Sequence, residues 1–201
     1  NKKFDFIIFD LDGVLFDTKQ NMLMAWNKTR KKYYIKKTFK FYFKELGLPF
    51  DKILENLGIQ ARPQIFKTYK EESIKHIDLI EPYRYVVKIL KFLKLNNIKF
   101  SIVTSKDFKR SSFLLKKFKI KPNSLHCPNK KLRGKPYPDH ILHAIKKNSA
   151  KLDSTCFVGD TYIDYLAAKN AKINFIFAKY GYGINKKKYS NKINSIRGIK
   201  N

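Results

Sequence analysis

Short apolar runs that end in polar residues, separated by segments with helical spacing, limit what this chain can fold into. Residues 4–10 form the first run, which is too short for a helix and is rich in Phe and Ile. Such a run is typical of a strand buried on both faces. Further strands are predicted at residues 99–103, 125–127, 155–158 and 173–177. Helices are predicted at about residues 86–95, 107–118 and 162–171, and from Pro138 onward.

Strands that alternate with helices predict an α/β fold, in which a parallel sheet carries helices on both faces. Residues 18–80 depart from this alternation. They show four amphipathic helical stripes and no convincing strand, and Gly47 and Gly58 end the second and third stripes. We therefore expect a small helical bundle inserted after the first strand, with Pro82 marking the return of the chain to the sheet.

The charge of the chain admits two interpretations. Lys and Arg number 44 and Asp and Glu number 16, which gives a formal net charge of +28. A polyanionic partner such as nucleic acid is one interpretation. The other is compositional, and it is favoured because the excess is Lys rather than the Arg that makes bidentate contacts to nucleic acid. The basic residues 185–201 are expected to form a last strand and helix at the sheet edge, with a basic arm as the alternative.

The chain shows no signal for a membrane or for secretion. No apolar run approaches the roughly 18–20 residues that span a bilayer. Asp5, Asp10 and Asp12 interrupt the apolar start, so a signal peptide is not expected. Two cysteines make no disulfide framework, and the expected compartment is therefore a reducing cytoplasm. The sequence carries no signal for an oligomeric state.

Polar residues end the predicted strands, and they should be considered together because ligands bind beyond the carboxyl ends of parallel strands. Asp10 and Asp12 lie two residues apart, so both side chains point the same way in an extended chain. Asp160 and Asp164 lie one helical turn apart on one side of a helix. The remaining residues of this group are Thr104 and Ser105, which end the second strand, and Lys135, in the loop after the third.

Several carboxylates packed together repel one another unless a cation lies between them. An oxygen-only set of ligands, without cysteine or histidine, suits Mg²⁺. Lys135 and Mg²⁺ together would neutralise a phosphate dianion, and Thr104 would donate a hydrogen bond to it. The strand ends therefore predict a site for a phosphoryl group.

Four motifs resemble, in order, those of the haloacid dehalogenase (HAD) superfamily, and most closely its phosphoglycolate-phosphatase-like branch with a small helical cap. They are Asp10-Leu11-Asp12-Gly13-Val14-Leu15-Phe16-Asp17-Thr18, Ile102-Val103-Thr104-Ser105-Lys106, Gly134-Lys135-Pro136 and Val158-Gly159-Asp160-Thr161-Tyr162-Ile163-Asp164. The resemblance implies a Rossmann-like, doubly wound parallel sheet built from residues 1–16 and 82–201. Residues 17–81 would form the α-helical cap.

The resemblance also implies a role for each matching residue. Asp10 would be the nucleophile, and Asp12 would protonate the leaving group and then activate water. Thr104 and Lys135 would hold the phosphoryl oxygens. Mg²⁺ would be bound by Asp10, the Asp12 carbonyl, Asp160 and Asp164. Thr18, Ser105 and Lys106 would contact substrate.

The function expected is therefore that of a Mg²⁺-dependent phosphatase, a phosphoric monoester hydrolase acting on a small phosphorylated metabolite such as a sugar phosphate or a phosphoglycolate-like acid. A phosphomutase of the β-phosphoglucomutase type shares the same nucleophile and remains an alternative. A basic nucleic-acid-binding protein, or a phosphatase of nucleic-acid ends, is another.

The sequence also departs from the branch at two glycine positions. No glycine follows Pro82 closely, and Lys172 stands where a glycine usually follows the helix of the fourth motif. These departures concern the backbone rather than the chemistry, because every catalytic position of the four motifs is filled.

Overall fold

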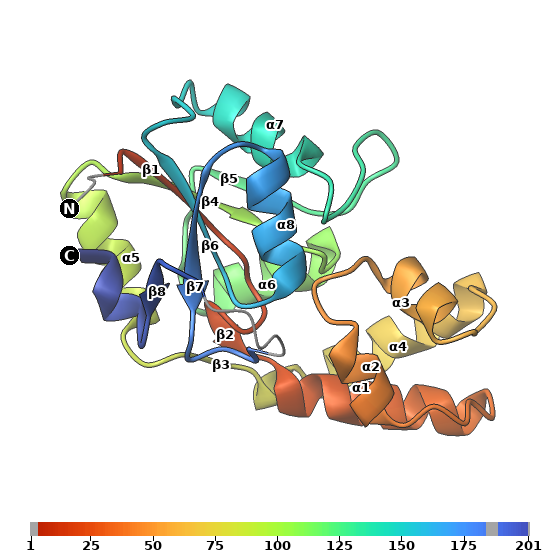
Figure 1. The fold of residues 1–201 in the computed structure, drawn as a ribbon. Helices are drawn as coiled ribbons and strands as arrows, with labels where there is room; N and C mark the ends of the chain where they lie inside the picture. Colours follow the sequence, from red (N-terminus) through yellow and green to blue (C-terminus); the bar gives the residue numbers. More distant parts are fainter. Residues whose placement is uncertain (1–3, 184–188, 201) are drawn as a thin grey trace.

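The computed structural model describes residues 4–183 and 189–200, and in them six parallel strands form one sheet in the order β5-β4-β1-β6-β7-β8 (Figure 1). Strand β1 pairs with β4 on one side and with β6 on the other, so its Phe9 lies between Ile102 and Val158. The first strand of the chain is therefore central in the sheet. The strands are β1 (Phe6–Phe9), β4 (Lys99–Val103), β5 (Ser124–His126), β6 (Thr155–Gly159), β7 (Asn174–Ala178) and β8 (Lys192–Ile193).

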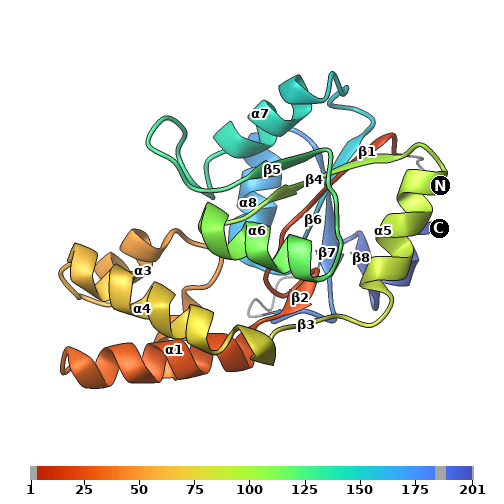
Figure 2. The same cartoon turned by 180° about the vertical axis from the view of Figure 1, so that it is seen from behind.

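Helices cover both faces of this sheet, as the alternation of side chains along β1 shows. Ile7 and Phe9 belong to one apolar cluster, which receives α5, α6 and the short 3-10 helix η2. Phe6 and Ile8 belong to the second cluster, which receives α7 and α8. Figures 1 and 2 show these two layers from opposite sides. The helices are α5 (Val86–Leu95), α6 (Phe108–Lys117), α7 (Asp139–Lys147), α8 (Tyr162–Asn170) and η2 (Ile196–Lys200).

The prediction of a doubly wound α/β sheet is confirmed, and the predicted elements agree with the structure to within a few residues. Pro138 caps α7 rather than occupying its first turn. The predicted last strand and helix at the sheet edge are β8 and η2, while residues 185–188 and 201 of the basic tail lie outside the described residues.

The inserted segment forms the expected helical bundle, which lies beyond the carboxyl edge of the sheet (Figures 1 and 2). Its core is aromatic: Trp26 stacks on Tyr42, with 4.6 Å between ring centroids, and Tyr42 contacts Tyr69. The bundle comprises α1 (Lys19–Lys32), α2 (Phe39–Lys44), α3 (Phe50–Asn56) and α4 (Pro63–Lys75), followed by the 3-10 helix η1 (Ile77–Leu79). We refer to these elements as the cap.

A two-stranded antiparallel ribbon carries the chain into and out of the cap. It pairs β2 (Phe16–Asp17) with β3 (Glu81–Pro82). Two residues per strand are too few to produce a periodic pattern, so the sequence did not predict this ribbon. Within the described residues, no helix is long and apolar enough to cross a membrane.

Lys172 follows α8 at the position where the branch usually has a glycine. Its backbone is left-handed, with φ of 57°. Its N–H donates to the Lys169 carbonyl and that of Ile173 to the Ala168 carbonyl, so α8 ends in a hydrogen-bonded left-handed turn. Tyr85, in the segment after Pro82 where the branch has its other glycine, is also left-handed, with φ of 73°.

Replacing Lys172 by Gly should stabilise the fold, because a side chain in this conformation is strained. We expect Lys172→Gly to raise the free energy of unfolding by about 0.5–1 kcal/mol in urea titrations. Lys169→Gly, at an exposed helical position of α8, is the matched control and should lower it by about 1 kcal/mol. A loss of stability in both variants would contradict this account of the turn.

Candidate active site

Asp10 and Asp12 follow the central strand directly. The Asp10 N–H donates to the Val158 carbonyl at 2.9 Å, so the strand pairing continues up to the carboxylate itself. Gly13 then turns the chain with φ of +82°, and a Cβ at this position would overlap the Asp160 carboxylate. Glycine is therefore required here both for the turn and for the approach of the neighbouring strand end.

Lys135 bridges two carboxylates at the centre of the site. Its Nζ lies 2.9 Å from Asp10 Oδ1 and 2.6 Å from Asp164 Oδ1, and all three side chains are buried. Burial opposes the ammonium charge, but the carboxylates of Asp10 and Asp164 outweigh it and raise the pKa of Lys135. Lys135 is thus a fixed positive charge beside Asp10.

The loop that carries Lys135 is held to the start of α7. The Arg133 guanidinium donates to both oxygens of the Asp139 carboxylate, at 2.9 and 3.0 Å. The Arg133 main-chain N–H donates to the same carboxylate. These hydrogen bonds join the two ends of the segment from Arg133 to Asp139 and so fix the position of Lys135 within it.

Asp160 and Asp164 extend from the end of β6 and the first turn of α8. Asp164 Oδ2 accepts hydrogen bonds from the Thr161 N–H at 3.0 Å and from the Thr161 hydroxyl at 2.6 Å, while Oδ1 faces Lys135. Asp160 Oδ2 accepts from the Tyr182 N–H at 2.7 Å. Asp160 Oδ1 is buried and has no hydrogen-bond partner among the described residues.

This cluster has the properties of a divalent-cation site. One oxygen from each of Asp10, Asp160 and Asp164 lies within 4.8 Å of the others, and all three residues are buried. Burial raises the pKa of Asp10 to about 7, in spite of Lys135, and raises that of Asp160 well above its usual value. A bound cation would both ionise these carboxylates and give Asp160 Oδ1 a partner, so the donor set fits Mg²⁺.

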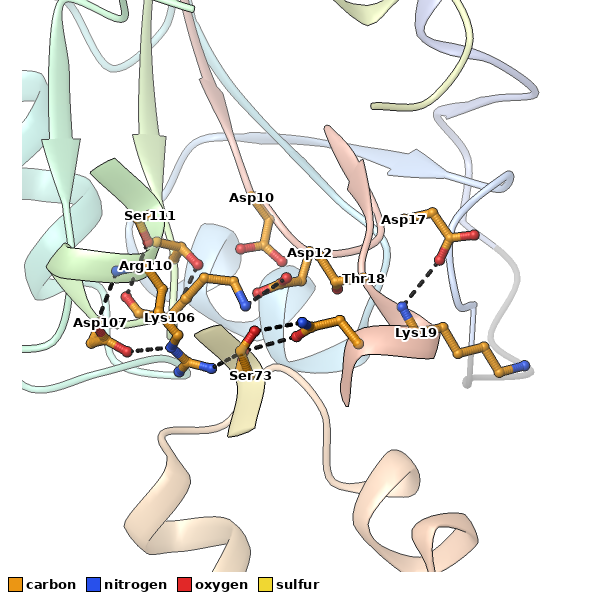
Figure 3. A network of polar contacts seen from close by, with 12 residues as sticks. Asp10, Asp12, Asp17, Thr18, Lys19, Ser73, Lys106, Asp107, Arg110 and Ser111 are labelled. Atoms are coloured by element: carbon orange, nitrogen blue, oxygen red, sulfur yellow. Dashed lines mark hydrogen bonds and ion pairs between the residues drawn. The ribbon is translucent and has the colours of Figure 1, made fainter. Parts of the chain in front are cut away.

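The predicted phosphate-binding residues follow β4 at the same edge. Thr104 lines the cavity beside Asp10 and is positioned by its N–H, which donates to the His126 carbonyl at 3.0 Å. Lys106 Nζ lies 3.1 Å from Asp12 Oδ1 (Figure 3). Burial lowers the pKa of Lys106 and the Asp12 carboxylate opposes that effect.

The hydroxyls of Ser105 and Thr18 both contact other protein groups, although Ser105 also lines the cavity. The Ser105 hydroxyl donates to the Gly47 carbonyl of the cap at 2.7 Å, so it joins the two parts of the protein. The Thr18 hydroxyl lies 2.9 Å from the Tyr182 hydroxyl, and the Thr18 N–H donates to the same oxygen. Thr18 is not among the described residues that line the cavity.

The cap covers the site and leaves a partly open cavity of about 60 Å³, which is room for a few water molecules. Its floor is formed by Asp10, Asp12, Thr104, Lys106 and Lys135. Every cap side chain in its wall is apolar or a tyrosine; these residues are Met22, Tyr42, Leu46, Leu48, Phe50, Ile53, Phe66 and Tyr69.

Arg110, Tyr42, Tyr69 and Tyr182 also line this cavity, and motif reasoning assigned none of them a role there. Tyr42 and Tyr69 look like ordinary members of amphipathic stripes in the sequence. Arg110 offers one weak signal, because it lies in the first turn of the helix that follows the end of β4 and therefore begins near the same edge of the sheet.

A strand-end carboxylate pair, a buried lysine and a second acidic pair beneath a helical cap define the α/β hydrolases of the HAD type. The family model described as haloacid dehalogenase-like hydrolase matches residues 7–178, and the chain belongs to this family.

The comparisons with individual proteins agree with that assignment. Pyrophosphatase PpaX of Halalkalibacterium halodurans is 29% identical over 187 residues, which cover 91% of this chain and 86% of that protein. A predicted phosphoglycolate phosphatase from Haemophilus somnus superposes with a TM-score of 0.81 at 21% identity, covering 98% of each chain. CbbY from Rhodobacter sphaeroides, solved in complex with phosphate, superposes with a TM-score of 0.81 at 14% identity over 98% of this chain and 99% of that one. These two superpositions show the shared fold.

Magnesium should stabilise the folded protein if the acidic cluster binds it. At a concentration of Mg²⁺ about 100 times its dissociation constant, we expect about 2.7 kcal/mol of stabilisation and a melting temperature about 5–10 °C above that measured in EDTA. Asp160→Asn should remove most of this difference, whereas Asp153→Asn, at an exposed carboxylate, should keep it. An equal response from wild type and Asp160→Asn in thermal denaturation would exclude Asp160 as a ligand.

Proposed function

We propose that this HAD-type hydrolase is a Mg²⁺-dependent phosphatase that acts in the cytoplasm on a small phosphorylated metabolite through an aspartyl-phosphate. The observation that carries the proposal is the position of Asp10: its carboxylate ends the central strand, faces the cavity and lies 2.9 Å from the Lys135 ammonium. A carboxylate with a fixed positive charge beside it, in a cavity beneath the cap, suits attack on a phosphoryl group.

In the first step, an Asp10 oxygen attacks phosphorus and the bond from phosphorus to the leaving oxygen breaks. Asp12 donates a proton to that leaving oxygen. Lys135 and the Thr104 hydroxyl bind the phosphoryl oxygens as negative charge builds on them. Asp10, the Asp12 main-chain carbonyl, Asp160 and Asp164 would hold Mg²⁺, which when bound would supply further positive charge for the phosphoryl oxygens.

In the second step, the Asp12 carboxylate takes a proton from a water molecule, whose oxygen attacks phosphorus. The bond between phosphorus and Asp10 breaks, and the Asp10 carboxylate is restored. Lys106, 3.1 Å from Asp12, holds that side chain on the leaving-group side of the cavity. The cap excludes other water, so the intermediate reacts with the water beside Asp12.

The largely apolar wall of the cap favours a compact substrate over a sugar phosphate. A sugar needs polar partners for its hydroxyl groups, and the cap supplies only two, the hydroxyls of Tyr42 and Tyr69. The same wall argues against the mutase alternative, because none of the cavity-lining cap residues described is an acid or a base beyond these two tyrosines. The pyrophosphatase name of the relatives points in the same direction.

Asp10→Asn should abolish turnover and leave the fold intact, since an amide is a poor nucleophile of nearly the same size. We would measure phosphate release from a panel that includes pyrophosphate, phosphoglycolate and sugar phosphates, with Mg²⁺ and with EDTA. Wild type and Asp153→Asn should release phosphate from selected compounds only with Mg²⁺, and Asp10→Asn should fall to background. Normal hydrolysis by Asp10→Asn would overturn the assignment.

Absence of release by a well-folded wild-type protein would instead favour the mutase or the polyanion-binding alternative. Conversion of one sugar phosphate isomer to another would identify the former, and tight, strongly salt-dependent binding to nucleic acid the latter.

Asp12→Asn should separate the two steps. General acid–base catalysis contributes about 10²–10⁴-fold, so the steady-state rate should fall by that factor. With p-nitrophenyl phosphate the leaving group needs no proton, and formation of the aspartyl-phosphate should outpace its hydrolysis. Stopped-flow absorbance should then show a burst of one nitrophenolate per active site. A steady rate without a burst, with the first step still fast, would contradict the role of Asp12 in the second step.

A further inference from the structure

Arg110 is a buried cation that the proposed reaction leaves unused. It lies in the first turn of α6, directly after the strand end that carries Thr104 and Lys106, and only 5% of its surface is exposed. Its side chain lines the same cavity as Asp10 and Asp12. Arginine buried to this extent normally has a charged partner, which here is Asp107.

Contacts from both the core and the cap hold this guanidinium in place (Figure 3). Arg110 Nε donates to Asp107 Oδ2 at 2.5 Å, and Nη1 donates to the Ser73 hydroxyl at 3.0 Å. The Ser73 hydroxyl in turn donates to Asn21 Oδ1 at 2.8 Å, so the partner on the cap is itself fixed. A guanidinium restrained in this way is organised for a ligand before the ligand arrives.

The cations of the cavity contact different carboxylates. Lys135 contacts Asp10 and Asp164, which belong to the proposed cation site. Lys106 contacts Asp12, the proposed proton donor to the leaving group. Arg110 follows Lys106 by four residues, lines the same cavity and is hydrogen-bonded to Ser73 of the cap, which covers the leaving group in the proposed reaction. Arg110 therefore belongs with Lys106, on the leaving-group side.

The wall beside Arg110 adds hydrogen-bond donors. The guanidinium carbon of Arg110 lies 5.4 Å from the Tyr69 ring centroid. The Tyr69 and Tyr42 hydroxyls are 2.8 Å apart. Burial raises the pKa of both tyrosines, which keeps them protonated. Because only one of the two protons is used between the hydroxyls, the pair retains one O–H for a ligand.

The Arg110 guanidinium keeps donor capacity for a ligand. It carries five N–H donors in a planar fork, and its hydrogen bonds to Asp107 and Ser73 use the Nε and Nη1 donors. The side chain also lines the cavity. A planar fork of this kind suits a carboxylate or a phosphate group.

We propose that Arg110 binds an anionic group on the leaving side of the substrate, so that it selects phosphoryl compounds whose leaving group carries a carboxylate or a second phosphate. This inference rests on the proposed function, because it takes Asp12 as the proton donor. Arg110 is then a specificity-determining residue, and a neutral leaving group of the same size forgoes its hydrogen bonds.

The test compares substrates that differ in one group. Phosphoglycolate and 2-hydroxyethyl phosphate differ by a carboxylate in place of a hydroxymethyl group, and pyrophosphate provides the phosphate version of the anion. For wild type with Mg²⁺, kcat/KM should be higher for phosphoglycolate or pyrophosphate than for 2-hydroxyethyl phosphate. In Arg110→Gln the ratio of kcat/KM for the anionic substrate to that for 2-hydroxyethyl phosphate should fall by about 10- to 100-fold. Only kcat/KM for the anionic substrate should decrease.

Lys109→Gln is the matched control, because it removes a neighbouring cation of α6 that is exposed and does not line the cavity. It should leave the preference for anionic leaving groups unchanged. If Arg110→Gln fails to fold in thermal denaturation, Arg110→Lys keeps the charge beside Asp107 but lacks the planar fork, and it should still reduce the preference several-fold.

The outcomes separate the two proposals. Hydrolysis by wild type with no preference for an anionic leaving group, or an equal loss on all substrates in Arg110→Gln, would overturn the role of Arg110 and leave the phosphatase assignment standing. Absence of Mg²⁺-dependent release from every compound would overturn the proposed function itself. Loss of the preference for phosphoglycolate but not for pyrophosphate would assign Arg110 to carboxylates, and the reverse result would assign it to phosphate.

Discussion

The bridge from the Lys135 ammonium to the carboxylates of Asp10 and Asp164 is the interaction on which the site depends. Three strand ends and one loop converge there, and four carboxylates lie close together in a buried place. Lys106 pairs with Asp12, so the single ammonium of Lys135 is left with Asp10, Asp160 and Asp164. Burial raises the pKa of Asp10 to about 7, and Asp160 has an oxygen without a hydrogen-bond partner among the described residues. This shortage of positive charge is the physical basis on which we propose a divalent cation and a phosphoryl group as ligands.

The cap covers the site and also contacts the residues that form it. Ser105 and Arg110 reach from the sheet to Gly47 and Ser73 of the cap, and Tyr182 lies among the cap aromatic residues while its N–H holds Asp160. Closure of the cap is therefore coupled to the same strand ends that hold the reacting groups. The cavity that results has a charged floor and an apolar wall, which strengthens each electrostatic contact within it.

Much of this could be predicted from the sequence, for physical reasons that differ between elements. Buried parallel strands appear as apolar runs, and the residues that end them must meet at one edge, so Asp10, Thr104 and Asp160 could be grouped without a structure. The contact of Thr18 with Tyr182 joins residues 164 positions apart, and that of Arg110 with Ser73 joins two different parts of the protein. Such pairings depend on how the cap docks, and no local pattern encodes that. The same docking engages Ser105 with the cap.

The most direct test of the account is to locate the phosphoryl group on the enzyme. Asp12→Asn, in which breakdown of the intermediate is slowed, would be mixed with Mg²⁺ and substrate, quenched in acid, digested and analysed by mass spectrometry. The account predicts that the peptide containing Asp10 gains the mass of one phosphoryl group, with the group on the Asp10 side chain. Turnover with the phosphoryl group on another residue, or with none bound to the enzyme at any time point, would contradict it.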